Sequence, residues 1–249
     1  MLVKYYKIAL YLCVIGTVVY TALNYFKAGL FPKVLVRPPP RRRNWLYAGL
    51  VVLFLFLCFL VDPAVKSRIL AMKSASLDPV FGFFNMFGDG YRLYAGLFVF
   101  FIIGKIFRWR KMERLFGLAL LSSVILGVVG QVVQNLTLRG RPYVTASAFD
   151  FFNYGLVFRE HLWGTAAYKS FPSGHAITIF SAAMPFVFSL RRWWWKAVLL
   201  AVPVMTGLAR IYFNKHWLSD VFMSAVLAAL LVRVLWKADQ AGLEKESAR

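Results

Sequence analysis

The chain has 249 residues, of which 60% are hydrophobic and 18% aromatic, and its formal net charge is +20. Soluble domains contain only about 45 to 50% apolar residues, so this composition excludes an ordinary water-soluble domain and predicts a membrane protein. The basic residues cluster between apolar segments, where they set topology and contact anionic headgroups, so we expect the bilayer and not nucleic acid as a partner. Cys13 and Cys58 lie inside apolar segments and support neither a disulfide framework nor a metal site.

Seven apolar segments are long enough to cross a bilayer, since a transmembrane helix needs roughly 20 mostly apolar residues. They cover residues 5–26, 45–61, 91–107, 115–136, 172–190, 197–212 and 217–236. The first begins as a secretory signal would, with Lys4 and Lys7 ahead of its apolar stretch, but no small-residue cleavage pattern follows it, so we predict an uncleaved helix. The fold class predicted is an all-α, polytopic membrane helix bundle. We divide it into an extra N-terminal transmembrane helix with a basic connector (1–44), a six-helix membrane domain (45–236) and a short cytoplasmic tail (237–249).

The connections between these segments differ in charge. Alternate connections hold eighteen of the 30 Lys and Arg residues, and cytoplasmic loops are the basic ones, so the N-terminus is predicted outside and the C-terminus inside. The outer connection at 62–90 is rich in Phe, with Phe81, Phe83, Phe84 and Phe87 close together. It is interpreted either as an amphipathic cover over a lipid entrance or as a hydrophobic cap packed on the bundle.

Three groups of polar residues fall on the predicted outer side. Arg139 and Arg141 follow the fourth segment, Pro-Ser-Gly-His at 172–175 opens the fifth, and Arg210 closes the sixth. The guanidinium fork matches phosphate oxygens, although a single arginine at a helix end is as readily explained by snorkelling. Ser173 and Gly174 lie at a helix start, where free N–H groups attract an anion, but the same residues serve as an ordinary helix cap.

The third group contains a histidine and a carboxylate. His216 and Asp220 are four residues apart and therefore share one helix face. A carboxylate bonded to one ring nitrogen leaves the other free to act as a nucleophile, although a purely structural pair has the same spacing. The chain has three histidines, and His175 and His216 both belong to these groups. Ionisable groups at membrane helix ends are rarely kept without a function, which favours a site.

The three groups together resemble the signature of the type 2 phosphatidic acid phosphatase superfamily. Its pattern is Lys, six residues, Arg-Pro; then Pro-Ser-Gly-His; then Ser-Arg, five residues, His, three residues, Asp. This chain matches it at 141–142, 172–175 and at Arg210, His216 and Asp220. Gln134 stands in place of the lysine and Ala209 in place of the serine. We expect Arg139 or Lys169 to restore the missing positive charge.

The resemblance implies a role for each residue and no cofactor or metal. It implies that His216 is the nucleophile that forms a phosphohistidine, that Asp220 orients it and that His175 is the acid. It also implies that Arg141, Arg210, Ser173 and Gly174 bind the phosphate. We add Arg139 to this set because it could restore the positive charge missing at Gln134.

The resemblance also implies a lipid phosphate or diphosphate substrate, of the polyprenyl diphosphate, phosphatidylglycerol phosphate, phosphatidic acid or lipid A type. The expected location is the inner membrane, with the site facing the periplasm or exterior. Lipid-to-lipid phosphotransfer and a non-catalytic lipid-binding or transport protein stay open as alternatives, and the oligomeric state is left unknown.

Overall fold

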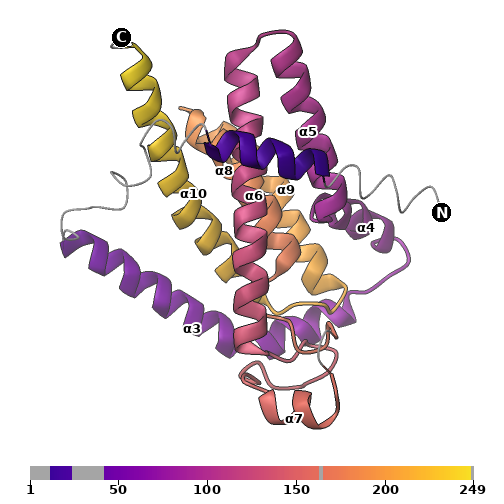
Figure 1. The fold of residues 1–249 in the computed structure, drawn as a ribbon. Coiled ribbons are helices and arrows are strands. Elements are labelled where there is room, and N and C mark those ends of the chain that lie inside the picture. Colours follow the sequence, from indigo (N-terminus) through magenta and orange to yellow (C-terminus); the bar gives the residue numbers. More distant parts are fainter. Residues whose placement is uncertain (1–11, 24–41, 163–164, 248–249) are drawn as a thin grey trace.

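The computed structural model describes residues 12–23, 42–162 and 165–247, and every regular element in these ranges is a helix (Figure 1). The predicted all-α fold class is therefore confirmed. In chain order the labelled helices are α3 (Arg42–Ala71), α4 (Asp78–Phe87), α5 (Gly90–Ile106), α6 (Arg110–Thr137), α7 (Tyr154–Arg159), α8 (Gly174–Ser189), α9 (Trp193–Tyr212) and α10 (Leu218–Ser247). An unlabelled helix, Leu12–Leu23, precedes them.

Four of these helices are long and apolar enough to cross a membrane. They are Asn44–Ala71 within α3, all of α6, all of α9 and Leu218–Gly242 within α10. The helices α4 and α5 meet at an angle of 56° and count as a fifth span if they cross together. The chain is therefore an integral membrane protein. Seven spans were predicted, and the described residues hold four or five by this measure, because α8 and Leu12–Leu23 are shorter than a full span.

The first predicted span coincides only in part with described structure. Residues 1–11 and 24–41 lie outside the described residues, so the crossing predicted for 5–26 and the separate unit predicted for 1–44 stay predictions. Within Leu12–Leu23, Val14 is buried against Leu97 and Phe101 of α5 and against Leu120 of α6. This helix therefore packs on the bundle, and Figure 1 draws it, in indigo, across the other helices.

Helix α8 lies at the centre of the bundle, between α6, α9 and α10. Most of its residues are buried, and its Phe180 and Met184 pack with Ala228 and Val232 of α10. On its other side, the hydroxyl of Ser122 in α6 donates to the carbonyl oxygen of Ser181 at 3.1 Å. Small side chains at this contact let the two backbones approach closely, as is usual between membrane helices. The position of α8 fixes where its first turn begins.

The region predicted as a long outer connection, 62–90, is largely helical. Helix α3 continues through Asp62 to Ala71, and α4 follows it. The hydropathy pattern ended at Asp62 because an acid normally ends an apolar run. Here the carboxylate is buried and paired with Arg139, so the helix continues past it.

Helix α4 packs along the C-terminal end of α9. The ring of Phe81 stacks on Tyr212 with centroids 4.2 Å apart, and the Tyr212 hydroxyl donates to Asp78 Oδ1 at 2.6 Å. The hydroxyl of Thr206 donates to the carbonyl oxygen of Phe84 at 2.9 Å. The opposite face of α4 is apolar and exposed, with Phe83 51% accessible. Of the two interpretations of the 62–90 region, the structure shows the hydrophobic cap packed on the bundle.

Candidate active site

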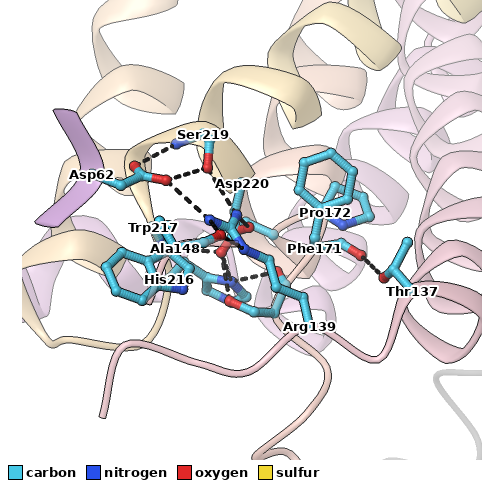
Figure 2. Close-up of polar contacts among 12 residues, drawn as sticks. Asp62, Thr137, Arg139, Ala148, Phe171, Pro172, His216, Trp217, Ser219 and Asp220 are labelled. Atoms are coloured by element: carbon cyan, nitrogen blue, oxygen red, sulfur yellow. Dashed lines mark hydrogen bonds and ion pairs between the residues drawn. The ribbon is translucent and has the colours of Figure 1, made fainter. Parts of the chain in front are cut away.

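The predicted polar residues meet at one end of the bundle. Arg141 follows α6, His175 lies in the first turn of α8, Arg210 in the last turn of α9, and His216 in the connection to α10. His175 lies within electrostatic range of Arg141, Arg210 and His216. At the same end, the hydroxyl of Thr137 in α6 donates to the carbonyl oxygen of residue 171 at 3.0 Å, just before α8 (Figure 2). Segments far apart in the sequence therefore form one polar centre.

His216 is almost fully buried and has a defined tautomer. Its Nδ1 lies 2.8 Å from the carbonyl oxygen of Ser170 and 3.4 Å from Oδ2 of Asp220. A carbonyl oxygen only accepts, so Nδ1 carries the proton and the lone pair is on Nε2. Burial, reinforced by the charges of Arg210 and Arg141, lowers the pKa of His216 to about 4 despite the opposing effect of Asp220. The ring is therefore neutral at pH 7, as a nucleophile must be.

The carboxylate of Asp220 is buried and surrounded by donors. Its Oδ2 accepts from the Ser170 hydroxyl at 2.5 Å and from the backbone N–H of Trp217 at 2.9 Å, and its Oδ1 accepts from Arg139 (Figure 2). The bond to Trp217 is of the capping-box type, in which an acid in the first turn satisfies an N–H that precedes the helix. These donors hold the carboxylate beside His216 and stabilise its negative charge.

Arg139 does not lie where a phosphate ligand would be needed. Its side chain is fully buried, and its five N–H groups all have protein partners. These partners are Asp62, Ala148, Ser219 and Asp220. The prediction that Arg139 binds phosphate or restores the charge missing at Gln134 is wrong for this structure, because a guanidinium with no free donor has none to offer a ligand.

Arg141 and Arg210, by contrast, have donors to spare. The Nε atoms of both are buried and lack a hydrogen-bond partner within the described residues. Nη2 of Arg141 donates to the carbonyl oxygen of Lys169 at 3.3 Å, and Nη1 of Arg210 donates to Oδ1 of Asn85 at 2.8 Å. Buried polar atoms are nearly always paired, so two neighbouring arginines with unpaired N–H groups indicate a site for an anion.

The start of α8 has the geometry expected of an anion-binding helix terminus. Ser173 is the N-cap, and its Oγ accepts from the backbone N–H of Ala176 at 3.4 Å. A Cβ on Gly174 would approach only Nε2 of Gln134, at 3.6 Å, which is an ordinary contact. The packing of the protein therefore does not require glycine at 174, whereas close approach of a ligand to the helix N-terminus does favour it.

Gln134 lies beside this helix start. It is buried, and its Nε2 donates to the carbonyl oxygen of Pro172 at 2.7 Å. Its Oε1 accepts from Gln131 at 3.2 Å. A neutral amide therefore occupies the place where the resemblance leads us to expect a lysine. Ala209, the other departure, is fully buried beside Arg210 in α9.

The structure adds residues that the sequence analysis missed. Asn85 of α4 contacts Arg210, and Gly88 lies against His175 so closely that a Cβ on Gly88 would be 2.7 Å from the Cβ of His175. Asp62 of α3 binds Arg139, with which it forms a buried ion pair at 3.0 Å. In the sequence, Asp62 was the one of these residues that a pattern could have revealed, because it is an acid within an otherwise apolar region. No sequence pattern marked Asn85 or Gly88.

Fold and site together define an integral membrane protein of helices whose polar centre combines two histidines, a carboxylate and two arginines. The model of the PAP2 superfamily matches residues 114–242, and this chain belongs to that superfamily. The match includes all of the site except the residues contributed by α3 and α4.

Two curated proteins are similar to parts of the chain. Lipid A 1-phosphatase of Porphyromonas gingivalis is 40% identical over 70 residues, which are 27% of this chain and 16% of that protein. The putative undecaprenyl-diphosphatase YbjG of Escherichia coli is 30% identical over 101 residues, which are 39% of this chain and 45% of that protein. The chain thus matches less than half the length of either relative.

A crystal structure has a similar fold over most of its length. That of Aquifex aeolicus LpxE superposes with a TM-score of 0.52 at 24% identity and covers 71% of this chain and 95% of that one. At 24% identity, this similarity shows a shared fold.

Proposed function

We propose that this protein is a membrane phosphatase that removes a phosphoryl group from a lipid phosphate or diphosphate through a phosphohistidine on His216. The observation that carries this proposal is the state of His216, which is buried, neutral and bonded through Nδ1 to Ser170, so that its Nε2 lone pair is free. Beside it, Arg141 and Arg210 hold unpaired N–H groups suited to phosphoryl oxygens.

In the first half of the reaction, Nε2 of His216 attacks phosphorus, and the bond from phosphorus to the lipid oxygen breaks. His175 donates its proton to the departing oxygen, so that the lipid leaves as an alcohol, or as a monophosphate if the substrate is a diphosphate. The negative charge of the bound substrate offsets the positive charges of Arg141 and Arg210, and this favours the protonated form of His175. Ser173 and the N–H groups at Gly174 complete the phosphoryl cradle.

In the second half, water attacks phosphorus and the bond to Nε2 breaks. The water proton passes to His175, which restores the acid for the next cycle, and His216 returns to its neutral form. The imidazolium present in the intermediate is stabilised by Asp220, which lies 3.4 Å from Nδ1. The two arginines supply positive charge at the phosphoryl oxygens, so this mechanism proceeds without a metal ion.

The proposed substrate is a lipid whose tail remains in the bilayer, because the site lies at one end of a membrane helix bundle next to the exposed apolar face of α4. Both curated relatives carry names of phosphatases that act on such lipids, lipid A and undecaprenyl diphosphate. The charge distribution favours an outward-facing site, toward the periplasm or exterior.

The test is release of inorganic phosphate from a panel of lipid phosphates by the purified protein in detergent. The panel contains polyprenyl diphosphate, phosphatidylglycerol phosphate, phosphatidic acid and lipid A. We expect turnover of at least one of them by the parent, no change on addition of a chelator, and no turnover by His216→Ala. Thin-layer analysis of the lipid products separates hydrolysis from transfer to a second lipid. A His216→Ala protein that releases phosphate at the parental rate would overturn the proposal.

A further inference from the structure

A fully buried arginine lies behind the proposed catalytic carboxylate. The guanidinium of Arg139 joins Asp220 on one side to Asp62 on the other, with Nη2 3.0 Å from Asp62 Oδ2 (Figure 2). The Arg139 carbon Cζ also lies 4.8 Å from the ring centroid of Phe59 and 5.5 Å from that of Trp217. Arginine stacks on aromatic faces in this way, and the rings exclude water from its charged group.

Asp62 holds the start of α10 from a different helix. Its Oδ1 accepts from the backbone N–H of Ser219 at 3.0 Å, and its Oδ2 accepts from the Ser219 hydroxyl. Ser219 in turn accepts from Nη1 of Arg139 at 2.8 Å. A carboxylate from α3 thereby satisfies an otherwise free N–H in the first turn of α10, next to Asp220. The polar chain runs from Asp62 through Arg139 to Asp220 and His216.

We propose that Arg139 and Asp62 are positioning residues for the phosphoryl transfer, which fix the Asp220 carboxylate and set the net charge behind His216. This inference rests on the proposed function and goes beyond it, because neither residue touches the phosphoryl group. The fixed orientation follows from geometry, since the fork of Arg139 contacts Oδ1 of Asp220 and so leaves Oδ2 facing His216.

The net charge of the buried cluster also bears on the reaction. With both carboxylates ionised, Asp62, Arg139 and Asp220 together carry one net negative charge. The imidazolium ring of the phosphohistidine carries one positive charge, which the negative charge of the cluster balances, while Arg141 and Arg210 face the phosphoryl oxygens. Without Arg139, two carboxylates would repel each other, and the proton taken up to relieve the repulsion would be shared between them, so that Asp220 would be ionised only part of the time. Without Asp62, the cluster would be neutral, and the imidazolium would lose its counter-charge.

A second ion pair between an arginine and a buried aspartate lies outside the site and serves as a control for the Arg139 pair. Arg114 in α6 donates through Nε to Oδ1 of Asp239 in α10, at 2.6 Å, and the carboxylate is again buried. This pair also joins two helices but lies far along α6 and α10 from Arg139 and Asp220. Substitutions in it report what the loss of an interhelical Arg–Asp pair does to stability alone.

The experiment compares Arg139→Gln, Asp62→Asn and the double variant, with Arg114→Gln, Asp239→Asn and their double variant as controls. Phosphate release and thermal unfolding are measured for each purified protein. We expect Arg139→Gln to lower kcat about 100-fold with little change in KM, as misplacement of a catalytic group does. In the double variant Asp220 is the only remaining acid of the cluster, the net charge of minus one is restored, and kcat should recover about 10-fold, a typical coupling between groups in contact.

A purely structural role predicts the opposite pattern. In that case the double variant would be no more active than Arg139→Gln, and the effects on kcat would match those of the Arg114 and Asp239 controls; either result overturns the inference. If Arg139→Gln does not fold, Asp62→Asn decides alone, since it keeps the shape of the cluster and removes one charge. We expect it to lower kcat about 10-fold, and an unchanged kcat would refute the inference.

The two proposals fail in distinguishable ways. If the parent releases no phosphate from any lipid of the panel, or if His216→Ala remains active, the proposed function fails. If the parent is active, His216→Ala is inactive and the charge-restoring double variant shows no recovery, the proposed function stands and the inference about Arg139 and Asp62 fails.

Discussion

Asn85 of α4 accepts a hydrogen bond from Nη1 of Arg210 in α9, at 2.8 Å. This bond leaves Nε of Arg210 buried and without a partner in the part of the chain that the structure describes. One end of the guanidinium is thus fixed by the protein, while another N–H is kept for the anion. The cap helix α4 therefore also orients a residue of the proposed phosphate site.

This relationship predicts that Asn85→Ala weakens substrate binding. Arg210 would lose its orienting acceptor, and we expect kcat/KM to fall about 10-fold, in line with about 1.5 kcal/mol for a hydrogen bond to a charged group. Steady-state kinetics on the best substrate of the panel measures the effect. Asn135→Ala is the control, because Asn135 is exposed and donates to the carbonyl oxygen of Gln131 in its own helix. Equal kcat/KM for Asn85→Ala and the control would contradict the prediction.

Gly88 gives a steric prediction. A Cβ at this position would lie 2.7 Å from the Cβ of His175 and 2.8 Å from Cγ2 of Thr206, so Gly88→Ala must displace α4 or the first turn of α8. Small shifts of a catalytic group are expensive, and we expect kcat to fall about 10- to 100-fold. Gly82→Ala, within α4, introduces a Cβ with nothing within 4 Å and should leave kcat unchanged. An unchanged kcat in Gly88→Ala would contradict the prediction, because it would show that the site accommodates the added Cβ without loss of activity.

Gln134 predicts an effect on phosphate affinity. Its amide lies beside Gly174 and donates to the carbonyl oxygen of Pro172. Gln134→Lys would add a positive charge at the start of α8, and a charged hydrogen bond contributes about 1.5 to 3 kcal/mol. We therefore expect the Ki of inorganic phosphate as a competitive inhibitor to fall at least about 10-fold. Asn135→Lys, at the neighbouring exposed position of α6, is the control. A Ki that stays the same or rises in Gln134→Lys would argue against a phosphate site next to Gly174.

His216 predicts an acid-labile fold. Its pKa is about 4 in the folded protein, against about 6.5 when exposed, so below pH 6.5 the unfolded chain takes up a proton that the folded chain does not. The contribution is absent above pH 6.5 and grows as the pH falls toward 4, where it destabilises the fold by about 3 kcal/mol. Thermal unfolding in detergent between pH 7 and 4 measures it. His216→Gln should lose part of this pH dependence, and identical profiles for the parent and His216→Gln would contradict the assignment.

The arrangement of the site was predicted well where it depended on local spacing. The four-residue interval between His216 and Asp220 brings them within 3.4 Å, although His216 lies in the connection before α10 and not on a shared helix face. The segment at 172–175 begins a helix at Ser173 as its cap pattern indicates. Both results depend on interactions within a few residues, capping in one case and a short chain interval in the other, and are therefore visible in sequence.

Arg139 was interpreted wrongly for the opposite reason. An arginine two residues before Arg141 has the same local pattern whether it faces a ligand or the protein. Its partners Asp62 and Ser219 lie 77 and 80 residues away, so only the tertiary structure shows that all its donors are used.

The sequence by itself determined the helical membrane fold and the set of residues that form the polar centre, because apolar run length, caps and motif spacing are local properties. The tertiary structure decided which of those residues keep donors free for a ligand. It also decided that α3 and α4, through Asp62, Asn85 and Gly88, complete the site. Such contacts depend on how helices distant in the chain pack together, and no short-range pattern records that packing.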